Sequence, residues 1–160
     1  MRSSRLSILR GNILNYSLAA ADRAGQRGVL IARSLWPHLR LTQQAGPDDR
    51  AGTDAYGFGL FGEERVQIKF DQRIATSGNV YHEVYEKTLG KPDQLWRASA
   101  HTARWYIFTT DGHAWLVPVD ALARMEIGMR LTAISATSIG FLIAEERLHE
   151  YGCERRVHAL

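Results

Sequence analysis

The stretch from Glu64 to Asp71 most constrains how this chain folds, because apolar and polar residues alternate along it. Val66 and Ile68 would share one face of a strand, and Gln67 and Lys69 would share the other. A period of two residues is typical of a half-buried β-strand. We therefore predict a strand that holds an amide and a lysine side by side on one face.

Two further strands are predicted on either side of this one, at residues 54–61 and 80–87. The upstream strand begins at Asp54 and is joined to the central strand by a tight turn. The downstream strand follows a Ser-Gly-Asn turn, is rich in β-branched and aromatic residues, and carries Glu83. We predict a three-stranded meander that brings an aspartate, the Gln-x-Lys pair and a glutamate together.

This order of residues resembles the PD-(D/E)XK nuclease superfamily, the restriction-endonuclease-like fold. In that superfamily an Asp precedes an acidic-X-Lys triplet on the next strand of a hairpin. The run QIKFDQRIATSGNVYHEVYE is most similar to small phage and prokaryotic nucleases, and the resemblance extends over about residues 50 to 125. It implies an α/β (α+β) domain with a mixed central sheet flanked by helices.

The resemblance also implies a site that hydrolyses phosphodiester bonds with Mg²⁺ or Mn²⁺. Asp54 would be the principal metal ligand, and Gln67 and the Ile68 carbonyl would be further oxygen ligands. Lys69 would be the catalytic cation that counters negative charge on the phosphate. Glu83 would be a supporting ligand or the base that positions the water.

Two departures from the family pattern stand out. Gln67 occupies the position where the family has Glu or Asp, and a neutral amide is a weaker ligand for a hard cation than a carboxylate. Arg104 stands where these nucleases often carry an Asp. Asp48 and Asp49, in the polar loop at residues 43–53, remain alternatives to Asp54 as the first acid.

Positive charge is unevenly distributed, which points to a polyanionic partner such as DNA. Residues 1–47 hold seven Arg and one Asp, and seventeen of the twenty basic residues of the chain are Arg. Arginine binds phosphate bidentately, although an arginine-favouring genome explains the same count. The side chains predicted to contact DNA are Arg5, Arg10, Arg33, Arg40, Arg97 and Arg104.

The length of 160 residues suits a single domain, residues 1–160, with three parts. We expect a basic helical part at 1–47, a core with the motif strands at 50–125, and C-terminal strands and a helix at 126–160. A lone cysteine, Cys153, excludes an internal disulfide framework and a Cys-based zinc site. Since no apolar run reaches the roughly 18 residues of a membrane span, we predict a cytoplasmic protein with no membrane partner.

The remaining elements follow from local signals. An Asp111-Gly112 turn predicts a hairpin, and paired glycines at 25 and 28 predict a break between two helices. The expected helices cover about residues 3–25, 29–39, 95–102, 118–125 and 145–151, and the expected later strands cover 105–110, 113–118, 130–136 and 139–144.

Three functions remain open on the sequence alone. The first is a metal-dependent DNA nuclease, and the second is a catalytically inactive nuclease-fold module that binds DNA or assists assembly. The third is a protein-interaction domain, in which Lys69, Asp71 and Glu83 are solvated or cross-strand-paired charges. Related nucleases often act as dimers, so a homodimer is also open.

Overall fold

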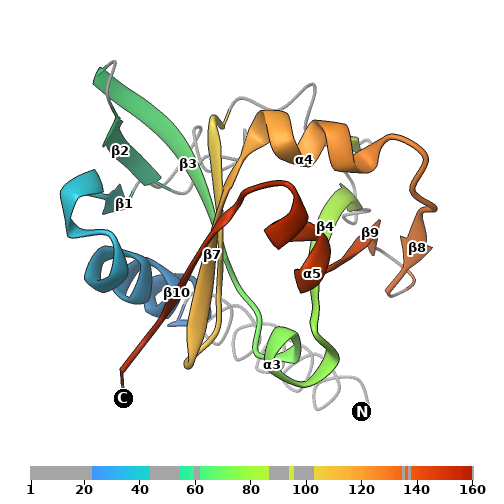
Figure 1. Cartoon of the computed structure of the whole chain (residues 1–160), viewed down its shortest axis with the longest axis horizontal. Coiled ribbons are helices and arrows are strands. Elements are labelled where there is room, and N and C mark those ends of the chain that lie inside the picture. Colours follow the sequence, from blue (N-terminus) through green and yellow to red (C-terminus); the bar gives the residue numbers. More distant parts are fainter. Residues whose placement is uncertain are drawn as a thin grey trace, which may run out of the picture.

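A computed structural model of the chain describes residues 23–43, 55–59, 62–86, 94–95, 103–134, 136 and 138–159. Two β-sheets and several helices make up this part of the chain, which confirms the predicted α+β class. Figure 1 shows the helix at residues 23–35 on one side of the larger sheet, and the smaller sheet with two helices on the other side. The larger sheet is therefore the middle layer of the molecule.

The larger sheet, sheet A, has six described strands in the order β1-β2-β3-β6-β7-β10. Strand β3 pairs with β6 in parallel and the other neighbours are antiparallel, so the sheet is mixed as expected. The strands are β1 (Thr42–Gln43), β2 (Ala55–Gly59), β3 (Gly62–Phe70), β6 (Trp105–Thr109), β7 (His113–Pro118) and β10 (Glu154–Val157).

The smaller sheet, sheet B, is antiparallel and has the described order β5-β4-β9-β8. Its strands are β5 (Gln94–Leu95), β4 (Asn79–Glu86), β9 (Ser138–Ala144) and β8 (Thr132–Ala133). The predicted meander is therefore wrong in one respect: β2 and β3 form a hairpin, but β4 belongs to the other sheet.

The chain changes sheets through α3 (Arg73–Ser77), whose first residues we expected to extend the strand, at about residues 64–74. The Asp71 carboxylate accepts a hydrogen bond from the backbone N–H of Arg73 at 3.0 Å, which starts this turn. Gly78 ends the helix in the left-handed conformation that glycine adopts readily. Strand β3 consequently stops at Phe70.

The helix at residues 23–35 runs through both glycines that were predicted to break it. A Cβ atom at Gly28 would lie 3.2 Å from the Cβ of Phe70 and 3.2 Å from the Oγ1 of Thr109. Gly28 thus allows the helix to pack closely on β3 and β6, and it does not mark a turn. The helix ends before Pro37, where the 3₁₀ turn η1 (Pro37–Leu39) follows.

Sheet A separates two hydrophobic cores. On the helix side, Val29, Ala32 and Trp36 pack against strand residues such as Ile68 and Ile107. The core on the opposite side contains residues from both sheets and from α4 and α5, among them Tyr106, Phe108, Trp115, Leu122, Phe141 and Leu148. Alternating residues of β6 supply the two cores, as the two-residue period requires.

The C-terminal part contains α4 (Val119–Glu126), α5 (Glu145–Glu150) and the strand β10. Both helices were predicted, whereas β10 was missed because Glu-Arg-Arg-Val lacks apolar alternation. Arg156 attaches this strand to the first described helix by donating to the Leu35 carbonyl and by lying 5.4 Å from the Trp36 ring. Most of the predicted helix at 95–102 and of the loop at 43–53 lies outside the described residues.

None of the helices described here has the length and apolar character needed to cross a membrane.

Candidate functional site

The β2–β3 hairpin holds the Gln-x-Lys triplet. Ala55 pairs with Val66, the residue before Gln67. Gln67 is buried at 5% exposure and Lys69 is half-buried, on the face opposite Val66 and Ile68. The predicted alternation of β3 is confirmed. Asp54, which precedes Ala55 in sequence, lies outside the described residues, as do Asp48 and Asp49.

The side of β3 that carries Gln67 and Lys69 faces the core between the two sheets. Gln67 pairs with Tyr106 of β6, and Lys69 pairs with Phe108. Both aromatic residues belong to that core. The Tyr106 ring meets the ring of His82 edge-on, with 5.2 Å between their centroids. The imidazole of β4 therefore approaches this face of sheet A.

His82 forms a buried pair with Glu126, the last residue of α4. Its Nε2 lies 2.9 Å from the Glu126 carboxylate, and the exposed fractions of the two residues are 1% and 7%. The pair joins sheet B to α4 inside the hydrophobic core. The sequence offers no second histidine at metal-ligand spacing from His82 and favours a hydrogen-bonded or exposed side chain, and the structure shows the hydrogen-bonded one. The alternation of Val80, His82 and Val84 along β4 was the signal that placed it inward.

Glu83 lies on the opposite side of β4 from His82. Its carboxylate accepts a hydrogen bond from the Ser138 hydroxyl, which lies 2.8 Å from the Tyr81 hydroxyl. Burial raises the pKa of Tyr81, and the Ser138 contact opposes that shift. The structure therefore does not bring Glu83 to Gln67 and Lys69, because β4 pairs within sheet B and turns this residue away from the core.

Lys69 forms no ion pair with any residue that the structure describes. The nearby carboxylate of Asp71 is hydrogen-bonded to Arg73 at 2.8 Å, and this contact raises the pKa of Arg73. Lysine side chains commonly bury their aliphatic part and keep the ammonium in water, and the described acids leave the charge of the half-buried Lys69 uncompensated. The cross-strand pairing of Lys69 with Asp71 or Glu83 is not what the structure shows.

The six arginines predicted to contact DNA do not form one described surface. Arg5, Arg10 and Arg97 lie outside the described residues. Arg33 donates from its Nε to the Leu41 carbonyl at 2.7 Å, and Arg40 is exposed at the end of η1.

Arg104 directly precedes β6, and its backbone N–H donates to the Arg65 carbonyl at 2.8 Å. Both side chains are exposed. Sequence reasoning did not select Arg65 as a DNA contact, although it shares the two-residue period of Gln67 and Lys69. Arg65 therefore lies within β3, beside Arg104 in the folded chain.

A hydroxyl, an imidazole and a carboxylate also meet beside the β6–β7 turn. His113 lies between Thr110 and Glu145, and the Trp115 indole N–H donates to the same carboxylate at 2.6 Å. The Thr110 hydroxyl, however, donates to the His113 carbonyl at 2.9 Å. Its hydrogen is committed to the turn, so this arrangement does not provide an activated nucleophile.

The described residues do not by themselves fit a Mg²⁺ or Mn²⁺ ion. Gln67 and the Ile68 backbone offer only neutral oxygen atoms, and Glu83 faces elsewhere. Within the described part of the chain, no three His, Cys, Asp or Glu residues are grouped to hold a metal. Hard cations favour carboxylate ligands. The carboxylates that the sequence offers for this site, Asp54, Asp48 and Asp49, lie outside the described residues.

No family model, curated protein or solved structure matches this chain. The resemblance to PD-(D/E)XK nucleases therefore stays a prediction.

Proposed function

We propose that this chain is a DNA nuclease that hydrolyses phosphodiester bonds at the β2–β3 hairpin. The observation that carries the proposal is the half-buried Lys69, which has no acidic partner among the described residues and lies beside Gln67. A cation that no described acid compensates favours an anionic ligand, because a phosphate would neutralise it. The order of Asp54, Gln67 and Lys69 along the chain, which resembles that of PD-(D/E)XK nucleases, also supports the proposal.

The chain's own residues have distinct tasks in this proposal. The Lys69 ammonium stabilises the negative charge that grows on the phosphate oxygens during attack by water. The Gln67 amide is 5% exposed, so its task is to support Lys69 from the inner part of β3 and not to contact water or phosphate. Asp54 directly precedes β2 in sequence and is the first candidate to activate the water.

The test is incubation of plasmid DNA with the wild-type protein and with Lys69→Gln, in Mg²⁺ and in Mn²⁺. We expect nicked or linear DNA with the wild type and a loss of about 10²–10³-fold in rate with Lys69→Gln, as for removal of one charge-stabilising group. Arg155→Gln, an exposed arginine on β10, is the matched control. Equal rates for the wild type and Lys69→Gln would overturn the proposal.

A second function, a catalytically inactive DNA-binding module of the same fold, is favoured by one observation. Gln67 is 5% exposed and neutral, so the triplet lacks both the charge and the accessibility of a metal ligand. This module would bind DNA in EDTA, with affinity that falls as salt rises, and would leave the DNA intact. Cleavage that Lys69→Gln abolishes excludes it.

A further inference from the structure

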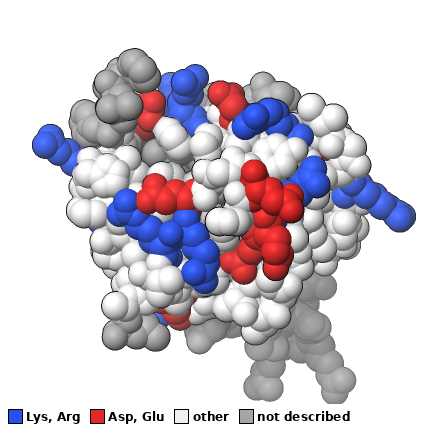
Figure 2. Space-filling view, viewed as in Figure 1, with Lys and Arg blue, Asp and Glu red and all other residues white. Residues whose placement is uncertain are grey.

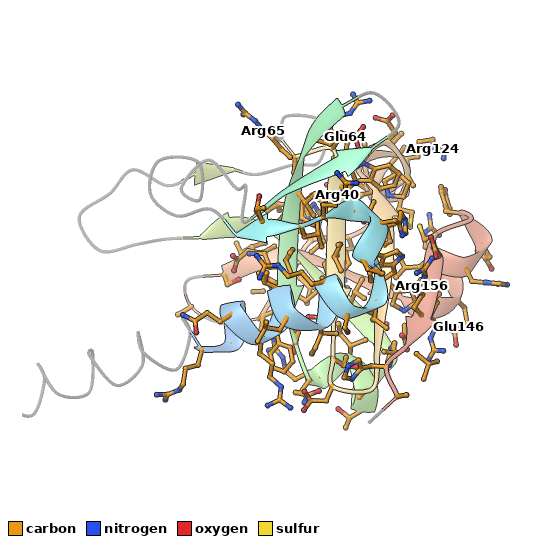
Figure 3. The ribbon with its side chains drawn as sticks, turned by 90° about the vertical axis from the view of Figure 1, so that its left-hand side faces the viewer. Arg40, Glu64, Arg65, Arg124, Glu146 and Arg156 are labelled. Carbon is orange, nitrogen blue, oxygen red and sulfur yellow. The ribbon has the colours of Figure 1, made fainter. Side chains whose placement is uncertain are left out.

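Two exposed arginines lie side by side at one end of sheet A, where β3 meets β6. The backbone N–H of Arg104 donates to the Arg65 carbonyl at 2.8 Å, which fixes the two residues as neighbours on adjacent segments. Figure 3 shows Arg65 extending from β3 away from the body of the molecule. The Arg65 side chain therefore reaches solvent two residues from Gln67.

The backbone that carries this pair is held on both sides. The Arg104 carbonyl accepts a hydrogen bond from the backbone N–H of Val119, the first residue of α4, at 2.9 Å. Arg65 pairs with Tyr56 of β2. The backbone of the two arginines is thus held by two strands and the start of a helix. Ligand binding therefore does not have to order the backbone at this place.

The positive charges of this pair are not neutralised by described acids. Neither Arg65 nor Arg104 forms an ion pair within the part of the chain that the structure describes. Glu64, the neighbour of Arg65, accepts a hydrogen bond from the Trp105 indole. Like charges on adjacent strands repel one another, and an anion between them removes that cost.

Arginines elsewhere on the surface have a different environment. Figure 2 shows basic side chains over β10 next to acidic side chains over α5. Arg156 of β10 is bonded to Glu154, and α5 carries Glu145 and Glu146 in its first turn. Charges of both signs offset one another there. Arg65 and Arg156 also lie well apart in Figure 3.

We infer that Arg65 and Arg104 form a clamp for backbone phosphates of duplex DNA. The guanidinium group matches phosphate bidentately and stays charged at every relevant pH. Two such groups on neighbouring segments bind one phosphate together or two consecutive phosphates of one strand. The clamp rests on the proposed DNA contact, and it positions the duplex beside the hairpin without reading base sequence.

The experiment is fluorescence anisotropy of a labelled DNA duplex in EDTA, titrated with protein over a series of salt concentrations. The variants are Arg65→Gln, Arg104→Gln, the double variant and the control Arg155→Gln. All three sites are exposed, and thermal melting confirms that each variant is folded. EDTA separates binding from any metal-dependent cleavage.

We expect each single change to weaken binding and to lower the slope of log affinity against log salt by about 1, and the double change to lower it by about 2. Arg155→Gln should match the wild type. A double variant that binds like the wild type, or a control that loses as much affinity as the double variant, overturns the clamp. Wild-type protein that shows no binding overturns it as well.

This result is separable from the result for hydrolysis. Binding that depends on Arg65 and Arg104 without any cleavage by the wild type refutes the nuclease and retains the clamp. Cleavage that is unaffected by the double change retains the nuclease and refutes the clamp.

Discussion

Strands β3 and β4 were both expected to carry the site, and the structure gives them opposite characters. On β4, polar groups are paired within the protein: His82 with Glu126, and Glu83 with Ser138. On β3, Lys69 has no acidic partner among the described residues, and the neighbouring Arg65 has none either. Strand β4 uses these polar residues to join sheet B to α4 and to link β4 with β9, whereas β3 leaves its cations available.

This difference teaches that sequence proximity to a motif does not assign a residue to a site. A buried polar group that already has a partner contributes to a unique core arrangement, and removing the partner is costly. A cation without a partner contributes little to stability and is available to a ligand. Four substitutions test whether partnered polar groups matter more to stability than the unpartnered cation Lys69, from the largest expected effect on stability to the smallest.

The largest effect is expected from Glu126→Ala. This change leaves the buried His82 imidazole without its hydrogen-bond partner and leaves a cavity where the Glu126 side chain was, and we expect a loss of about 3–5 kcal/mol in the free energy of unfolding. Urea denaturation measures it. Glu150→Ala, an exposed acid on α5, is the control and should stay within about 0.5 kcal/mol of the wild type. A similar small change for Glu126→Ala would show that the pair is not structural.

A smaller loss of stability is expected from Gly140→Ala, at a point where the paired strands β9 and β4 lie very close together. The added Cβ would lie 2.2 Å from the His82 carbonyl oxygen and 2.9 Å from the Glu83 Cα, so the strands must shift. We expect about 1–3 kcal/mol of destabilisation, the usual cost of overpacking. Gly112→Ala, with no atom within 4 Å of the added Cβ, is the control. Equal denaturation midpoints for the two variants would contradict the close approach.

The third prediction concerns alkaline pH. Burial raises the pKa of Tyr81 above its ordinary value of 10.0. Above that value the unfolded chain loses the phenol proton first, so the native state binds more protons and stability falls as pH rises. Tyr81→Phe should remove this part of the alkaline loss and also cost about 0.5–1.5 kcal/mol at neutral pH through the lost Ser138 contact. Melting curves between pH 8 and 11 measure both effects. An identical alkaline slope in the variant would refute the assignment.

The smallest effect on stability is expected from Lys69→Gln. Since the ammonium has no acidic partner in the described structure, its removal should change the free energy of unfolding by less than about 0.5 kcal/mol. Urea denaturation next to Glu126→Ala makes the contrast direct. A loss above 2 kcal/mol would reveal a structural partner for Lys69 and would remove the distinction between the two strands.

Local sequence patterns predicted much of the fold. The alternation of β3, the Asp-Gly turn of the β6–β7 hairpin and the apolar spacing of α4 each act over a few residues. The sheet of β4 was not predictable in this way, because Tyr81 pairs with Leu142, sixty-one residues away. Gly28 misled the reading because the same residue serves turns and close helix packing. Arg65 was not selected as a DNA contact because Arg104 is its neighbour only in the folded chain.

The proposal that the site lies on β3 and excludes Glu83 of β4 is tested most directly by the initial rate of plasmid cleavage. The rate is measured for Lys69→Gln, for Glu83→Gln and for the wild type. We predict that Lys69→Gln loses about 10²–10³-fold, whereas Glu83→Gln retains activity within a few-fold of the wild type. Loss of cleavage in Glu83→Gln together with full activity in Lys69→Gln would contradict the assignment of the site to β3.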